Sequence, residues 1–192
     1  NYYYRVKAFK GEAESGFSYI VFVRSGIGIP KNLSVIPNGV TGLVISWEPV
    51  EGAGNYYIYR SRNENANFDE IGFSETNKYE DKNLIAGRIY YYKVKSAGKG
   101  IESGLSESAF AMTKVAAPKT INIRQVTQET ISFEWTSVDL VDGYKIYRSD
   151  INNNSYKELD YTTETSYVDK GLETNSVYYY KVTAFVGKTV SD

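Results

Sequence analysis

The most constraining feature of this 192-residue sequence is that it repeats itself at an interval of 88 residues. Residues 90–94, with the sequence Tyr-Tyr-Tyr-Lys-Val, recur as residues 178–182 and, with Arg in place of Lys, as residues 2–6. Aligned without gaps, residues 30–104 and 118–192 are identical at 21 of 75 positions. A repeat at a fixed interval indicates a chain of successive structural units, so the fold has to be predicted one unit at a time.

The phase of the repeat divides the chain into three parts. Residues 2–30 match residues 90–118 at 11 of 29 positions, so the chain begins near the end of a unit. We expect residues 1–28 to be the C-terminal strands of a partial unit (the first segment), residues 29–116 to be a complete unit (the middle unit), and residues 117–192 to be a unit without its last strand (the C-terminal unit). This phase predicts a segment of a longer tandem array.

Composition excludes several classes of function. The sequence has no Cys and no His, which excludes disulfides, thiolate nucleophiles, imidazole catalysis and ordinary zinc sites. Its 22 Lys and Arg residues balance 23 Asp and Glu residues, which argues against electrostatic capture of nucleic acid. The sequence also has no apolar run long enough to span a membrane. We therefore expect no enzyme, no cofactor and no metal site.

Short β-prone runs separated by turn residues fill the middle unit, and no stretch has the 3.6-residue period of a helix. Leu43, Ile45 and Trp47 alternate with more polar residues, as on a strand with one buried face. The first predicted strand begins at residue 33. The other six lie at residues 42–47, 56–60, 68–73, 78–80, 88–97 and 105–113. We predict an all-β fold of tandem, seven-stranded antiparallel β-sandwiches.

The repeated positions resemble a known family. Each unit has a Pro, a Trp on the second strand, Tyr-x-Ile on the third strand, and Leu-x5-Tyr-x-Tyr-x-Val ending on the sixth strand. These residues are Pro30, Trp47, Tyr56, Ile58, Leu84, Tyr90, Tyr92 and Val94, and then Pro118, Trp135, Tyr144, Ile146, Leu172, Tyr178, Tyr180 and Val182. The set is similar to that of fibronectin type III domains, and the third-strand sequence Tyr-Lys-Ile-Tyr-Arg-Ser, residues 144–149, resembles bacterial surface and secreted copies more than animal matrix copies.

The resemblance implies an Ig-like sandwich and assigns structural roles within it. A tyrosine corner would fall on Tyr90 and Tyr178, whose hydroxyls would bond backbone groups of the loop before the sixth strand. The core would also include Trp47, Trp135, Leu84 and Leu172. The adhesive tripeptide of the family, Arg-Gly-Asp, does not occur in this sequence.

Outward-facing tyrosines on the third and sixth strands form the candidate surface-contact set. These strands are neighbours in the fold, so their side chains can form cross-strand pairs. The set consists of Tyr57, Tyr59, Tyr91, Tyr147 and Tyr179, with Lys93, Lys145 and Lys181 among them. One interpretation is an aromatic platform for a glycan or another chain. The interpretation we favour at this point is ordinary surface packing, because aromatic residues are enriched on strands.

Two further patterns suggest chemistry only superficially. Asp150-x-Asn152-x-Asn154 is similar to the start of a calcium loop, but Ser155 stands where Gly is required and Tyr161 where Glu is required. Carboxylates such as Glu48 and Glu51 lie in a predicted solvated loop with no apolar pocket, which argues against a glycosidase pair. Neither pattern predicts a functional site.

The hypothesis that follows is a non-catalytic spacer array in an extracellular or cell-surface protein, linking or presenting other domains of the same longer chain. The short connections around Pro30 and Pro118 predict a semi-rigid rod. One alternative is a filament or lattice subunit, joined to like subunits through the unpaired edge of the C-terminal unit. Another alternative is an accessory module of a secreted polysaccharide-degrading enzyme, with glycans as partners.

Overall fold

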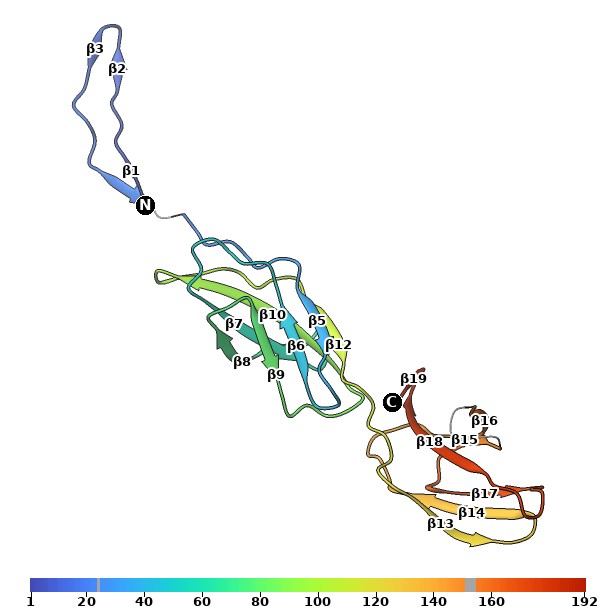
Figure 1. The fold of residues 1–192 in the computed structure, drawn as a ribbon. Helices are drawn as coiled ribbons and strands as arrows, with labels where there is room; N and C mark the ends of the chain where they lie inside the picture. Colours follow the sequence, from blue (N-terminus) through green and yellow to red (C-terminus); the bar gives the residue numbers. More distant parts are fainter. Residues whose placement is uncertain (24, 151–154) are drawn as a thin grey trace.

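The computed structural model describes residues 1–23, 25–150 and 155–192. Every regular element among these residues is a β-strand, so the prediction of an all-β fold is confirmed. No helix in this part of the chain could cross a membrane. Figure 1 shows the chain as an elongated row, with an N-terminal hairpin followed by two β-sandwiches.

Two antiparallel sheets form the middle unit. The first has the order β5-β6-β9 and the second has the order β8-β7-β10, with β11 and β12 both paired to β10. Their bounds are β5 Ser34–Pro37, β6 Leu43–Ser46, β7 Asn55–Ser61, β8 Asp69–Ser74, β9 Lys78–Asp81, β10 Ile89–Gly98, β11 Ile101–Glu102 and β12 Ala109–Met112.

Alternation along these strands builds the core of the middle unit. On β6, Leu43 and Ile45 are fully buried, and Trp47 follows directly after the strand. On β10, Tyr90, Tyr92, Val94 and Ser96 point inward, while the residues between them face outward. Because side chains alternate between the faces of a strand, each sheet presents one apolar face to the other, as in a sandwich.

The C-terminal unit repeats this arrangement, with sheets ordered β13-β14-β17 and β16-β15-β18-β19. Their bounds are β13 Ile121–Val126, β14 Thr130–Trp135, β15 Gly143–Ser149, β16 Lys157–Thr162, β17 Ser166–Lys170, β18 Tyr179–Val186 and β19 Thr189–Val190. The part of β18 that corresponds to the β12-paired part of β10 pairs with β15 on one side, and no described strand pairs with it on the other side. Tyr178 and Tyr180 are therefore only half-buried, whereas Tyr90 and Tyr92 are buried.

The first segment is one long hairpin. β1 (Tyr2–Tyr4) pairs with β4 (Val21–Val23), and β2 (Phe9–Lys10) pairs with β3 (Ala13–Glu14) nearer the tip. The hairpin has the register of β10 with β12, since Tyr3 lies opposite Phe22 as Tyr91 lies opposite Phe110. Both faces of the hairpin are exposed.

One predicted strand differs from the structure. Residues 105–113 were expected to form a continuous strand, but β12 covers only Ala109–Met112. The preceding residues are held to β10 through serine side chains, because Ser103 and Ser106 take over hydrogen bonds that a regular strand would make through its backbone.

Candidate functional site

The tyrosines expected at the corners of the two units make equivalent hydrogen bonds. The hydroxyl of Tyr90 accepts the N–H of Ile85 at 3.0 Å, and the hydroxyl of Tyr178 accepts the N–H of Glu173 at 2.9 Å. Leu84 and Leu172, which precede these loops, are both buried. The contacts fix the crossover from one sheet to the other and leave no reactive group at the corner.

The tryptophans lie deep in the two cores. Trp47 and Trp135 are 3% and 4% exposed, and each packs edge-on against a strand tyrosine, Tyr56 or Tyr144, with ring centroids 5.1 and 5.4 Å apart. Such edge contacts are a favourable aromatic geometry. Both indole N–H groups are buried without a hydrogen-bond partner among the described residues.

A buried polar network connects the two sheets of the middle unit. Asp81, on β9, accepts hydrogen bonds from Arg60 Nη1 at 3.1 and 2.9 Å and from the hydroxyl of Tyr92 at 2.7 Å. The Asp81 side chain is 7% exposed and that of Arg60 is 33% exposed. Burial, reinforced by the bond to Asp81, raises the pKa of the Tyr92 hydroxyl far above its usual value. The network therefore favours a protonated Tyr92.

The C-terminal unit has the same network in a looser form. Arg148 Nη1 lies 3.3 and 3.1 Å from the Asp169 carboxylate, and the Tyr180 hydroxyl lies 2.8 Å from it. Asp81 recurs as Asp169 at the 88-residue interval, but the sequence alone assigns neither residue a role. The sequence did contain a signal for this network, because a charged residue that recurs at the 88-residue interval indicates the same role in both units.

Serine side chains attach the interrupted last strand to the sixth strand. Ser106 Oγ accepts the N–H of Val94 at 3.0 Å, and the Ser106 N–H donates to the carbonyl of Val94 at 2.9 Å. Ser103 makes the same pair of bonds with Ser96. Equivalent bonds join Ser18 to Val6, Ser15 to Ala8 and Ser191 to Ala184. In the middle and C-terminal units these serines satisfy the buried backbone N–H groups of Val94, Ser96 and Ala184, which is the requirement for a buried donor.

The junction between the middle and C-terminal units is packed rather than open. Val115, in the connecting segment, is 3% exposed and belongs to the core cluster of the C-terminal unit. Gly87 has a φ of +63°, and a methyl group added to it would lie 3.1 Å from a Val186 methyl. A side chain at position 87 would thus disturb both the backbone and the contact.

Two polar contacts cross the same junction. Arg88 Nη2 donates to the carbonyl of Leu140 at 3.1 Å, and Lys114 Nζ lies 2.7 Å from the Asp192 carboxylate. The second contact is an exposed ion pair and contributes little by itself. The orientation of the two units is therefore determined mainly by Val115, Gly87 and Arg88.

The candidate surface-contact residues of the middle unit lie together on the outer face of one sheet. In the strand register, Tyr59 lies between Lys93 and Glu70, and Tyr57 lies between Lys95 and Phe73. Tyr91 stacks at an angle on Phe110, with ring centroids 5.3 Å apart. This face is therefore aromatic, with charged side chains between the rings.

Tyr59 is the most constrained residue of this face. Its hydroxyl donates to Glu70 at 2.9 Å, and partial burial together with this bond raises the pKa of Tyr59 to about 12. Lys95 Nζ lies 5.6 Å from the centre of the Tyr59 ring, within range of a cation–π contact.

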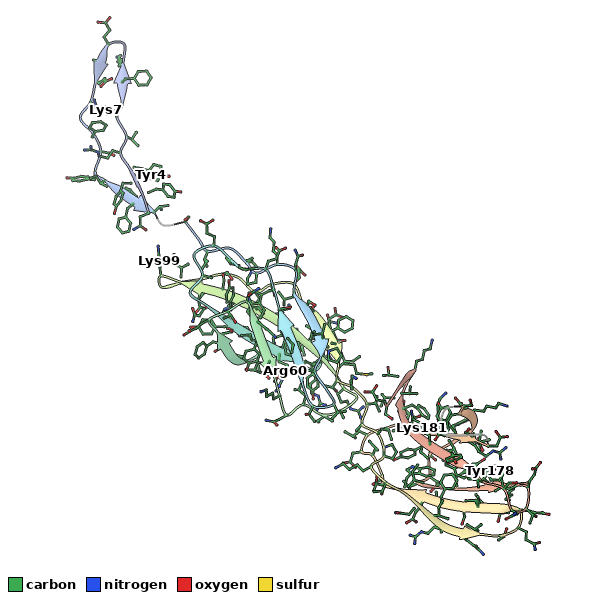
Figure 2. The ribbon with its side chains drawn as sticks, in the orientation of Figure 1. Tyr4, Lys7, Arg60, Lys99, Tyr178 and Lys181 are labelled. Carbon is green, nitrogen blue, oxygen red and sulfur yellow. The ribbon has the colours of Figure 1, made fainter. Side chains whose placement is uncertain are left out.

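The C-terminal unit has a matching face. Tyr147 lies between Lys181 and Glu158, and Tyr179 lies opposite Ser149, as Tyr91 lies opposite Ser61. Lys145 pairs with Glu158 at 2.9 Å. Figure 2 labels Lys181, which lies on β18, and Tyr178, which directly precedes that strand.

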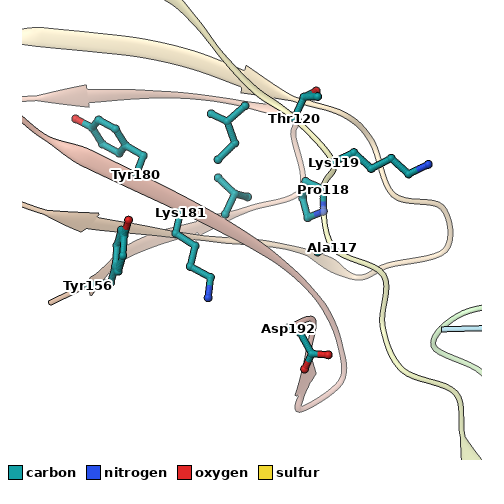
Figure 3. A pocket seen from close by; sticks show the side chains of 10 residues that line it. Ala117, Pro118, Lys119, Thr120, Tyr156, Tyr180, Lys181 and Asp192 are labelled. Atoms are coloured by element: carbon teal, nitrogen blue, oxygen red, sulfur yellow. The ribbon is translucent and has the colours of Figure 1, made fainter. Parts of the chain in front are cut away.

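A hollow marks the edge of β18. It has a volume of about 580 Å³, and Figure 3 shows it between the entering segment, Ala117 to Thr120, and the strand residues Tyr180 and Lys181. The corresponding hollow in the middle unit is lined on one side by residues 105–108 of the last strand. The hollow is therefore equivalent to the groove that the last strand borders in the middle unit.

The patterns that suggested metal or acid–base chemistry assemble no site among the described residues. Asn152 and Asn154, of the calcium-like pattern, lie outside that part of the chain. Within residues 1–23, 25–150 and 155–192, no three His, Cys, Asp or Glu side chains come together as metal ligands. Glu48 is exposed and accepts a hydrogen bond from Asn32 at 2.6 Å.

Comparison with known proteins agrees with this geometry. A sequence model of the fibronectin type III domain matches residues 28–111 and 116–192. A solved structure, the two fibronectin type III domain segment from chicken tenascin, superposes with a TM-score of 0.67 at 20% identity, covering 86% of this chain and 95% of that one.

Three curated proteins are similar in sequence. Mouse Tenascin-N is 27% identical over 159 residues, which are 82% of this chain and 10% of that protein. Amylopullulanase of Thermoanaerobacterium thermosulfurigenes is 32% identical over 53% of this chain and 6% of that protein. Poly(3-hydroxybutyrate) depolymerase of Ralstonia pickettii is 30% identical over 46% of this chain and 18% of that protein. The chain spans less than a fifth of each relative, and the three do not separate a bacterial type from an animal type.

Proposed function

Because the chain belongs to the fibronectin type III family, we propose that it is a non-catalytic spacer in an extracellular or cell-surface protein. In this role the sandwiches would hold other domains of a longer chain at a defined separation. The proposal needs stable units and a joint that resists bending, and both can be assessed from the contacts of the described residues.

The observation that carries the proposal is the junction between the middle and C-terminal units. Val115 lies between the two segments matched by the family, yet it is buried in the core of the C-terminal unit. A flexible linker would leave such a residue in solvent. Since Arg88 also bonds across the joint, bending would expose an apolar side chain and break a hydrogen bond.

Small-angle X-ray scattering tests this proposal. The wild-type chain should scatter as one elongated particle, and the double variant Arg88→Ala, Lys114→Ala should scatter as an ensemble with a range of bends. Lys78→Ala, an exposed substitution away from the joint, is the control and should match the wild type. Wild-type scattering that requires free motion between the two sandwiches would refute the spacer proposal.

The relatives support two settings for such a spacer. Tenascin-N supports a large extracellular protein, and the two similar enzymes support an accessory position beside a polymer-degrading catalytic domain. The aromatic outer face of the sheets favours the second setting, because exposed aromatic residues are a means of polymer contact.

A further inference from the structure

One group of surface residues is repeated although the core does not require it. Of the 21 positions identical between the two units, most belong to the core, the Arg–Asp–Tyr network or buried serines. Seven others remain, and four of these lie side by side on the outer face described above: Tyr59, Glu70, Tyr91 and Lys93.

The C-terminal unit presents the same four side chains in the same register, as Tyr147, Glu158, Tyr179 and Lys181. We call these two sets the repeated clusters. The neighbouring outward positions are not repeated, since Tyr57 is replaced by Lys145 and Lys95 by Thr183. Surface packing alone would not select these four positions while their neighbours change.

A β-bulge places the acidic member of each cluster. The pairing shifts between Ile58 and Tyr59, and at the equivalent point of the C-terminal unit it shifts between Ile146 and Tyr147. In each unit the bulge brings a Glu, rather than the apolar residue that follows it, opposite the cluster tyrosine. Bulges are a means of redirecting side chains, and here the same redirection occurs twice.

We propose that the repeated clusters are two binding sites for neutral polysaccharide. This function goes beyond spacing and deepens the accessory setting proposed above, on which its biological context rests. Two tyrosine rings offer apolar faces to the C–H face of a sugar ring, and their hydroxyls add polar tips. The lysine donates and the glutamate accepts hydrogen bonds, which suits hydroxyl groups that do both.

The balanced charge of the repeated clusters favours a neutral polymer over a charged one. Each repeated cluster has one Lys and one Glu, so neither a polyanion nor a polycation is favoured. Neither Lys93 nor Lys181 forms an ion pair with any described residue, although Lys93 Nζ lies 4.8 Å from the centre of the Phe68 ring. Both ammonium groups can therefore still donate hydrogen bonds to a ligand. Two sites built from the same four residue types suit a ligand that is itself a repeat, and two weak sites that engage the same polymer raise the overall affinity by avidity.

Affinity electrophoresis and pull-down with the whole chain test this proposal. The probes are amylopectin, cellulose and xylan, which are neutral, and polygalacturonate, which is acidic. The wild type should bind at least one neutral polymer, and Tyr59→Ala with Tyr147→Ala should weaken that binding by about tenfold or more. Tyr59→Phe with Tyr147→Phe, which keeps the rings, should lose less. Tyr19→Ala removes an exposed tyrosine outside the repeated clusters and should bind as the wild type.

Several outcomes would overturn the proposal. They are binding to none of the neutral polymers, binding to polygalacturonate alone, a loss of less than tenfold in the double alanine variant, and cluster-dependent self-association in place of glycan binding. Thermal melts should show every variant to be folded, since the substituted side chains face outward. Failure here would leave the scattering result unchanged, so this proposal and the spacer proposal can fail separately.

Discussion

Replacing Asp81 with Asn should destabilise the middle unit strongly. The substitution keeps the size of the side chain but removes the carboxylate charge, which accepts two hydrogen bonds from Arg60 and one from the Tyr92 hydroxyl. The NH2 group of the new Asn side chain would also face the donor groups of Arg60 and Tyr92. Breaking a fully buried ion pair costs about 3–5 kcal/mol, and a buried hydroxyl left without a partner costs about 1–3 kcal/mol. Because the Arg60 side chain is 33% exposed, solvent screens part of the loss.

We therefore expect Asp81→Asn to lower the free energy of unfolding by about 3 kcal/mol, which for a unit of this size lowers the melting temperature by at least about 12 °C. Urea unfolding followed by tryptophan fluorescence measures this loss. Trp47 reports on the middle unit when Trp135 is replaced by Phe, and Trp135 reports on the C-terminal unit when Trp47 is replaced by Phe. Tyr92→Phe should cost only about 1 kcal/mol. Asp169→Asn should cost less than Asp81→Asn, because Tyr180 is half-buried. A loss below about 1 kcal/mol for Asp81→Asn would refute this reasoning.

Three further predictions follow from the same contacts. Val115→Ala should lower the free energy of unfolding of the C-terminal unit by about 2 kcal/mol and leave that of the middle unit unchanged. The fluorescence of Trp135 and Trp47 reports the two units separately. Equal losses in both units would contradict the assignment of Val115 to one core. Since the pKa of Tyr92 is raised in the fold, its stabilising contribution is complete below about pH 10 and is lost as the pH rises through the raised value. Tyrosinate absorbance should then show Tyr92 ionising only as the unit unfolds, and ionisation near pH 10 in a folded unit would contradict it. Ser106→Ala should cost about 1–3 kcal/mol, because the N–H of Val94 loses its partner, whereas Ser34→Ala, a substitution of an exposed serine, should be nearly neutral in the same urea assay.

The fold could be predicted from the sequence because its determinants are local and repeated. The alternation of Leu43, Ile45 and Trp47 specifies a strand with one buried face, and the 88-residue interval shows that the same solution is used again. The tyrosine at the corner could be placed because its spacing from Leu84 is short and constant.

The polar network could not be predicted in the same way. Asp81 lies in one sheet, while Arg60 and Tyr92 lie in the other, so they meet only when the two sheets pack. Nothing local in the sequence shows that a charged residue will be buried against a partner 21 positions away. The repetition of all three residues was the one available signal.

The short connection between the units could be predicted, but the contacts that pack the junction could not. A lone apolar residue such as Val115, in a segment between two units, does not reveal which core it enters. The break before β12 has a similar origin, because Ser103 and Ser106 stabilise it through side-chain bonds to a neighbouring strand. In both cases the determinant is a tertiary contact rather than a local pattern.

The distribution of distances between the two sandwiches tests the central claim most directly. The sequence has no cysteine, so Asn65→Cys and Thr163→Cys, both at exposed positions, provide two specific sites for spin labels. Pulsed electron paramagnetic resonance should give one narrow distance population, which broadens when Arg88→Ala is added. A distribution that is already broad with Arg88 in place, and that does not change in the variant, would contradict a rod of rigidly joined sandwiches.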